Sequence, residues 1–354
     1  MGKPDARRGE AEYVRSRTGT GKRMAQFALT MSALVIVITQ AGLRGAQQSS
    51  QDLAQQIFDT MLEVPGTTAG YRVVHAKGIV CEGTLTASKE ASAISRAAQF
   101  KGGTVPLTIR FSDAAPSPTI PDSSPDAQPR GMAIRFNLSK KEKTDIVAFA
   151  HNGFVVGTGE DFLALEKAVV ATDPSKAHPW PIEAFLGTHP RALQFVQDPK
   201  PTPTSFSTEA FYGNNAFVFV NKSGAKQAVR YQILPVAGKH YLSDVDAKAK
   251  SPDFLFEEFR SRLPKEPVKF RLVVQLPAAG DATNDSTIVW PEDRKTVELG
   301  TITVTSVVAD SDSAQKALAF DPTNLTDGIE LSDDPIPALR RQVYMLSVMH
   351  RSGK

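Results

Sequence analysis

Short β-prone runs fill the middle of this chain, and their order is the feature that most restricts its fold. Turn residues separate the runs, which lie at 78–86, 105–111, 132–138, 145–149, 216–221, 228–234, 269–275 and 301–308. Helical spacing is found at 51–62, 160–170, 182–196, 243–262 and 336–351. A parallel sheet would require strands and helices to alternate regularly, and here they do not. We therefore expect an α+β fold, an antiparallel β-barrel with helices around it.

The chain begins with a basic segment over residues 1–23, followed by a mostly apolar segment over 24–44. This order is typical of a cleaved signal peptide or of a hydrophobic helix that anchors the chain in a membrane. In both cases we expect a periplasmic or otherwise extracytoplasmic protein, either secreted or held by its anchor. Residues 45–62 are expected to form a linker and a helix, and residues 63–354 one domain.

Composition excludes several classes of function. The formal net charge is only +3, and basic residues crowd the N-terminus, so we expect no nucleic-acid partner. The single cysteine, Cys81, excludes an intrachain disulfide and an all-cysteine metal site. Gly-rich phosphate loops, nucleophile elbows and H-E-x-x-H motifs are absent from the sequence.

Two local clusters have a chemical meaning. The first is the segment 72–78, which contains Arg72 and His75. The second contains Arg340 and Tyr344, which share a face if 336–351 is helical. A guanidinium beside a phenol favours the phenolate, and a tyrosine with an ordinary pKa of ~10 needs such help to bind iron as an anion. Taken alone, the pair is better explained by an arginine on a solvated face and a core tyrosine.

Several segments in order resemble catalases. Segment 72–78 resembles their distal haem segment, 110–112 and 129–136 resemble the two haem-pocket strands that follow, and 340–351 resembles the proximal helix. The resemblance covers residues 64–351 and is nearer to the small catalase-related peroxidases, because this sequence ends just after the proximal helix. It implies a barrel of the catalase type and haem b without covalent attachment.

The resemblance also implies roles for individual residues. His75 would be the distal acid–base group, supported by Ser112, and Tyr344 would bind the iron. Contacts to the cofactor or to its axial ligand are implied for Arg72, Arg110, Phe162, Arg340 and Arg351. The expected partners are a peroxide substrate and an unidentified electron donor.

One position departs from the family pattern. Phe149 stands where catalases carry a distal asparagine, and Asn152 is three residues further on. An apolar distal side should favour organic hydroperoxides over hydrogen peroxide. A fatty-acid hydroperoxide isomerase or dehydratase, a non-catalytic haem-binding barrel and a lipocalin-like barrel without haem are the alternatives. The sequence specifies no oligomeric state.

Overall fold

The computed structural model describes residues 48–353. The basic segment 1–23 and the apolar segment 24–44, predicted as a signal peptide or anchor, lie outside these residues. The first described element is a helix over 48–62, for which the sequence predicts a start at residue 51. From Leu53 onward the chain forms one compact unit, and the following description concerns that unit. Within the described residues, no helix has the length and apolar character needed to cross a membrane.

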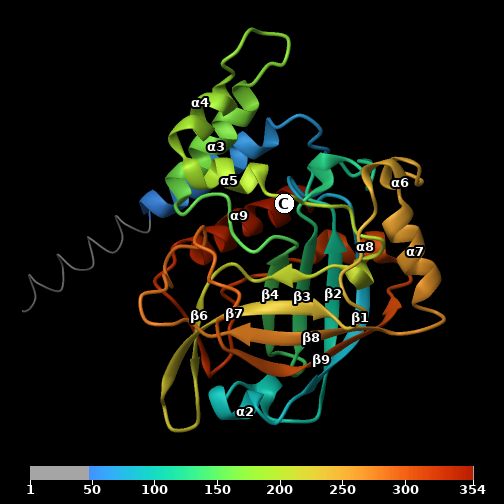
Figure 1. Ribbon diagram of the computed structural model, residues 1–354, viewed down its shortest axis with the longest axis vertical. Helices are drawn as coiled ribbons and strands as arrows, with labels where there is room; N and C mark the ends of the chain where they lie inside the picture. The colour runs from blue at the N-terminus through green and yellow to red at the C-terminus, as the bar shows by residue number, and fades with distance from the viewer. Residues whose placement is uncertain (1–47, 354) are drawn as a thin grey trace, which may run out of the picture. The chain divides into compact units, whose positions relative to one another are not determined.

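Eight antiparallel strands close into a barrel (Figure 1). Their order around the barrel is β7-β5-β4-β3-β2-β1-β9-β8, and β8 pairs with β7 to close the ring. The strands are β1 Gly78–Ala87, β2 Thr104–Ser112, β3 Gly131–Asn137, β4 Lys143–Phe149, β5 Phe211–Tyr212, β7 Lys226–Pro235, β8 Val268–Gln275 and β9 Thr296–Val307. The predicted antiparallel barrel is therefore confirmed.

Two further strands extend the barrel wall beyond β7. β6 (Phe217–Val220) pairs with the first residues of β7, and β10 (Ile329–Leu331) pairs with β6. Sequence periodicity does not predict β5 or β10, because two or three residues are too few to show alternation.

The barrel core follows from side-chain alternation. Along β2, Ile109 and Phe111 point inward and are fully buried, whereas Arg110 and Ser112 face the other side of the sheet. Phenylalanines dominate the interior, and the burial of each contributes roughly 1.5–3 kcal/mol to folding. The largest of these fully buried rings are Phe100, Phe111, Phe136, Phe206, Phe211, Phe219, Phe259 and Phe270.

The predicted helical ranges are found with two breaks. The helices are α2 Ala91–Ile94, α3 Gly159–Ala171, α4 Pro181–Thr188, α5 Pro190–Gln197, α6 Asp244–Lys248, α7 Phe254–Arg262, α8 Ser311–Ala317 and α9 Ile336–Arg351. The sequence does not predict α2 or α8. Short 3-10 turns occur at Ala98–Phe100, Pro125–Ala127 and Phe206–Thr208. The single helix predicted over 182–196 is two helices, because Pro190 forces His189 out of the helical region. The helix predicted over 243–262 is likewise divided, at Pro252.

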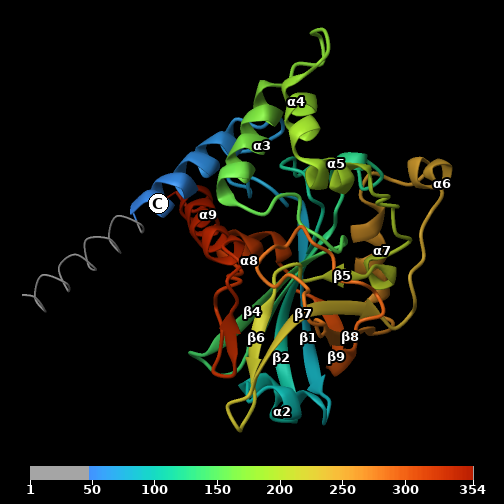
Figure 2. The same ribbon diagram turned by 60° about the vertical axis from the view of Figure 1, so that its left-hand side comes forward.

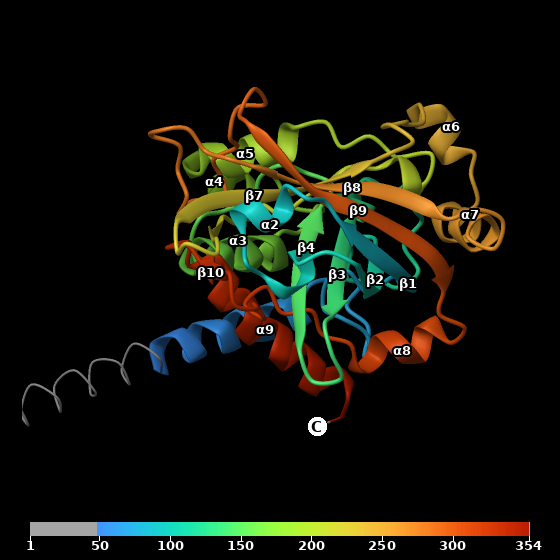
Figure 3. The ribbon, with the colours of Figure 1, turned by 90° about the horizontal axis from the view of Figure 1, so that it is seen from below.

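The helices are unevenly distributed around the barrel. Figures 1 and 2 show α3, α4 and α5 beyond one end of the barrel and α2 at the other. Seen from below in Figure 3, α8 and α9 lie on the side of β1–β4 that faces away from β7–β9. The outer face of β2–β4, which carries Arg110 and Ser112, is thus covered by the last helix of the chain.

Candidate functional site

One terminal residue from each of four neighbouring strands lies in a single row across the sheet. Gly78 pairs with Ser112, Ser112 with Gly131, and Gly131 with Phe149. The antiparallel register therefore places residues from four separate stretches of sequence side by side. His75 precedes this row by three residues, at the entry to β1.

A cavity of about 100 Å³ lies against this row. Most of its wall is apolar and comes from β2–β4, α9 and the segment 72–75. Six of the residues predicted from sequence line it, namely Arg72, His75, Arg110, Ser112, Tyr344 and Arg351.

His75 has a strained backbone. Its φ is 53°, and among the described residues it is the one non-glycine position with a positive φ. Such a conformation costs of order 1–3 kcal/mol and persists where the surroundings determine it. The amide of His75 donates to the Ala114 carbonyl at 2.8 Å, and Arg110 Nη2 donates to the His75 carbonyl at 2.8 Å. The guanidinium of Arg110 fits beside Gly78, where a Cβ would lie 2.2 Å from it.

The imidazole of His75 is held on one edge. Ser112 Oγ lies 3.1 Å from Nδ1, and a Cβ on Gly131 would come within 3.0 Å of the same nitrogen. Burial, with the charges of Arg110 and Arg340, lowers the pKa of His75 to about 3. The ring is therefore neutral near pH 7.

On α9, Tyr344, which lines the cavity, and Arg340 form the pair expected from their spacing. Arg340 donates to Tyr344 Oη from Nε at 3.0 Å and from Nη2 at 2.8 Å. A guanidinium can only donate, so the phenol oxygen accepts both bonds. Two charged donors therefore converge on the phenol oxygen that α9 presents to the cavity.

Two residues that sequence reasoning missed continue this network. Arg340 Nη1 donates to Asn215 Oδ1 at 3.0 Å, and Asn215 Nδ2 donates to Asp334 Oδ2 at 2.8 Å. Asn215 and Asp334 are both buried. Asp334 is visible in the sequence only as part of a helix-start signal, and no local pattern marks Asn215 as a neighbour of α9.

Two buried arginines, Arg110 and Arg351, and the half-buried Arg72 line the cavity without a carboxylate partner among the described residues. Arg72 donates to the Leu318 carbonyl, Arg351 to the carbonyls of Lys316 and Leu318, and Arg110 to Gln315 Oε1 at 2.9 Å. Burial lowers the pKa of Arg110 to about 9 and that of Arg351 to about 10. Burial and the charges of Arg110 and Arg351 also lower the pKa of Arg72. An anionic ligand would relieve this repulsion.

Phenylalanines continue from the histidine side of the cavity. Phe149 lines the cavity, and its ring is parallel to that of His75 with 6.0 Å between centroids. Phe149 in turn stacks with Phe154, and Phe154 with Phe162, each at 6.0 Å. Phe162, predicted to touch the cofactor, does not line the cavity and lies two rings behind His75. Asn152 does not line the cavity either.

The groups in the cavity fit haem b. The porphyrin supplies four nitrogen ligands, so the iron needs only an axial ligand from the protein, which Tyr344 can provide. Among the described residues, no group of three or more His, Cys, Asp or Glu side chains is placed to hold a bare metal ion. The two propionates would meet the guanidiniums of Arg72, Arg110 and Arg351, which have no carboxylate partner.

Comparisons with known proteins agree with this geometry. The family model described as Catalase matches residues 46–354. A protein named catalase-related peroxidase from Mycolicibacterium paratuberculosis is 36% identical over 301 residues, which cover 84% of this chain and 94% of the relative. Another of that name, from Synechococcus elongatus, is 32% identical over 302 residues, covering 84% and 88%.

Solved structures show the same fold. A fungal catalase superposes with a TM-score of 0.72 at 20% identity, over 81% of this chain and 60% of that one. Catalase A from Saccharomyces cerevisiae gives a TM-score of 0.71 at 20% identity, over 80% and 62%. This chain therefore spans about 60% of the length of these catalases.

Proposed function

This chain belongs to the catalase family and acts on peroxides as an oxidoreductase, and we propose that it is a haem peroxidase with His75 as distal acid–base group and Tyr344 as axial iron ligand. The observation that carries the proposal is the convergence of these residues on one cavity. His75 and Tyr344 are far apart in sequence, yet both line it together with three arginines that have no carboxylate partner.

Haem, when bound, supplies a redox-active iron at which the oxygen–oxygen bond of a peroxide is broken. The neutral imidazole of His75 would take up the peroxide proton at Nε2, in the tautomer whose Nδ1–H donates to Ser112 Oγ. The same nitrogen returns the proton to the departing oxygen, and such general acid–base catalysis contributes roughly 10²–10⁴-fold to the rate. Arg340 would hold the oxygen of Tyr344 in place as an iron ligand through its two hydrogen bonds.

We further propose that organic hydroperoxides are the preferred substrates. Phe149 gives the histidine side of the cavity an apolar wall, next to Val74 and Val147. An apolar wall has no donor to orient hydrogen peroxide, but it favours an organic group by burying its surface. Reduction of a hydroperoxide to an alcohol and water needs two electrons and two protons, so the proposal includes an external electron donor.

The decisive experiment is the visible absorption spectrum of the haem-loaded protein and of its Tyr344→Phe variant. A high-spin ferric spectrum of the tyrosinate-ligated type should change in the variant, with loss of most peroxide turnover, because the axial ligand is removed. A protein that cannot be loaded with haem would contradict the proposal.

Substrate assays then separate the alternatives. The expected result is donor-dependent reduction of cumene hydroperoxide that is faster than oxygen release from hydrogen peroxide. Comparable oxygen release and donor oxidation with hydrogen peroxide would contradict the substrate preference. Turnover of a lipid hydroperoxide without a donor would indicate the isomerase or dehydratase. Bound haem without any turnover would indicate a non-catalytic haem-binding barrel.

An extracytoplasmic location is also a proposal, supported by the basic and apolar segments over 1–44. Fractionation of cells that produce the full chain, with mass determination of its N-terminus, tests whether the protein is exported and whether it is cleaved or anchored. An intact chain found in the cytoplasm would contradict export.

A further inference from the structure

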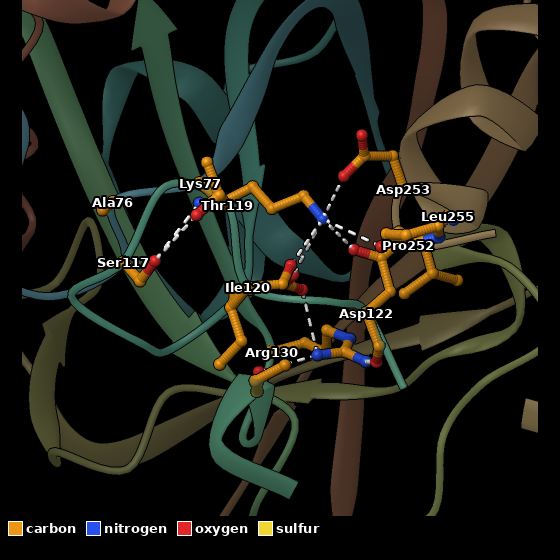
Figure 4. Close-up of polar contacts among 12 residues, drawn as sticks. Ala76, Lys77, Ser117, Thr119, Ile120, Asp122, Arg130, Pro252, Asp253 and Leu255 are labelled. Atoms are coloured by element: carbon orange, nitrogen blue, oxygen red, sulfur yellow. Dashed lines mark hydrogen bonds and ion pairs between the residues drawn. The ribbon is translucent and has the colours of Figure 1, made fainter. Parts of the chain in front are cut away.

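Two residues after His75, Lys77 occupies the centre of a buried charge cluster (Figure 4). Its Nζ lies 2.5 Å from Asp122 Oδ1 and 2.6 Å from Asp253 Oδ1. Lys77 and Asp122 are buried, while Asp253 is half exposed. A buried ammonium is unfavourable unless it is paired. Burial opposes the charge, but the hydrogen bonds that Lys77 donates to Asp122 and Asp253 raise its pKa, so it is a cation in place.

The cluster joins segments that are distant in the sequence. Lys77 Nζ also donates to the carbonyls of Ile120 at 2.8 Å and Pro252 at 3.1 Å. Asp122 Oδ2 accepts from the amide of Leu255 at 2.7 Å, at the start of α7. Figure 4 shows these contacts converging on the Lys77 ammonium from both sides. One ammonium thus ties the entry to β1 to the loop between β2 and β3 and to α7.

A second buried pair extends the cluster. Asp113 Oδ1 lies 2.9 Å from Arg130 Nη1, and Asp113 Oδ2 lies 3.8 Å from Lys77 Nζ. Asp113 directly follows Ser112, and Arg130 directly precedes Gly131. Charged members of the cluster are therefore immediate neighbours of the two residues that contact the ring of His75.

The backbone between these charges is what holds His75. His75 and Ala76 donate to the carbonyls of Ala114 and Ala115 at 2.8 and 3.1 Å, and Asp113 donates to the Lys77 carbonyl at 3.2 Å. The left-handed φ of His75 persists only while these neighbours fix it. Since the loop that accepts these bonds is itself anchored through Asp113 and Asp122, the cluster is a support for the strained residue.

We propose that Lys77 is a positioning residue for His75, which its ammonium holds in place by tying the segment 72–78 to the loop 113–130 and to α7. The inference rests on the proposed function of His75 as the distal acid–base group. It concerns the placement of the imidazole and gives Lys77 no contact with the substrate.

The test compares the haem-loaded wild type with Lys77→Met and, as a matched control, Lys226→Met. Lys226 forms an exposed ion pair with Glu330 at 2.5 Å, on β7 and β10, so the control removes the same group from a surface pair. In Lys77→Met, kcat/KM for cumene hydroperoxide should fall on the order of 100-fold, mainly through kcat, because misplacement by about 1 Å has effects of that size. The control should remain near wild type.

A second readout does not depend on turnover. Hydrogen cyanide must lose its proton to a distal base as it binds ferric haem, so its association rate reports the placement of His75. That rate should fall together with kcat/KM in Lys77→Met, while the ferric absorption spectrum, set by Tyr344, stays unchanged. A folded variant with wild-type cyanide association and wild-type kcat/KM would overturn the proposal.

Because Lys77→Met leaves Asp122 buried without its cation, that variant can fail to fold. The double variant Lys77→Met/Asp122→Asn removes both charges and keeps an oxygen to accept from Leu255. Slow cyanide association in the folded double variant would support the proposal, and a wild-type rate would overturn it. A wild type that binds no haem would contradict the proposed function and this inference with it. Failure of the inference alone is distinguishable, because the wild type then binds haem and turns over peroxide while the variants behave like it.

Discussion

The two sides of the cavity are built in different ways. Arg340 and Tyr344 are four residues apart on α9, so one regular helix places both groups. His75 lies outside any helix or strand, has a left-handed φ, and takes its ring contacts from the ends of β2 and β3. The pair on α9 is thus a local structure, whereas the assembly around His75 depends on long-range contacts.

This difference indicates how each side should respond to change. Helical hydrogen bonds keep Arg340 and Tyr344 in register whatever happens to distant loops. The position of His75 depends on Ser112, Gly131 and the buried charges behind them. We therefore expect substitutions on the distal side to change reaction rates, and substitutions on α9 to change cofactor binding.

The largest expected effect is that of His75→Ala, which should lower the reaction rate without changing haem binding. His75→Ala should lower kcat/KM for cumene hydroperoxide by roughly 10²–10⁴-fold, the usual contribution of a general acid–base group. Haem content and the ferric spectrum should be those of the wild type, because Tyr344 is untouched. Loss of haem from His75→Ala would show that the distal side also holds the cofactor and would break the comparison.

A pH dependence of stability should follow from the buried imidazole. Burial, with the charges of Arg110 and Arg340, lowers the pKa of His75 to about 3 in the folded chain, against ~6.5 when unfolded. Below pH 6.5 the unfolded chain therefore binds a proton that the folded chain does not, and the free energy of unfolding decreases as the pH falls.

When the pH is lowered from 7 to 4.5, His75 should lower the free energy of unfolding by about 3 kcal/mol. This value follows because pH 4.5 lies two units below the unfolded pKa of ~6.5. Urea unfolding of the wild type and of His75→Gln, at equal haem occupancy, measures the difference. Parallel pH curves for the two proteins would show that the imidazole is not held neutral.

Arg351→Leu tests whether α9 holds more than the axial ligand. The variant should bind haem about 10–100-fold more weakly, since a hydrogen bond to a charged group contributes ~1.5–3 kcal/mol. Arg341→Leu is the matched control on the same helix, because Arg341 is exposed and forms a surface pair with Asp321 at 3.4 Å. Equal haem affinity in the two variants would show that Arg351 does not contribute to haem binding.

The smallest effect is expected at Phe162. Because it lies behind Phe149 and Phe154, Phe162→Leu should leave the haem spectrum and the peroxide preference unchanged and cost about 1 kcal/mol of stability. Phe149→Leu, on the cavity wall, is the informative counterpart and should change the ratio of activities toward organic and hydrogen peroxide. A shifted ferric spectrum in Phe162→Leu would place that ring in contact with the cofactor after all.

Features that depend on neighbouring residues could be predicted from the sequence. Alternation predicted most of the barrel strands, because side chains of a strand point to opposite faces. The spacing of Arg340 and Tyr344 predicted their contact, because residues four apart share a helix face. The segment around His75 was identified through its resemblance to a known family.

Contacts between residues far apart in the sequence became visible only in the tertiary structure. Arg340 is hydrogen-bonded to Asn215, 125 positions away, and Lys77 to Asp122, 45 positions away. No sequence periodicity predicts either contact. Phe162, expected at the cofactor, lies behind the cavity wall. The left-handed backbone of His75 was likewise seen only in the structure. The physical reason is that strand register and loop packing depend on contacts summed over the whole barrel, whereas a sequence pattern reports only the residues within a few turns of it.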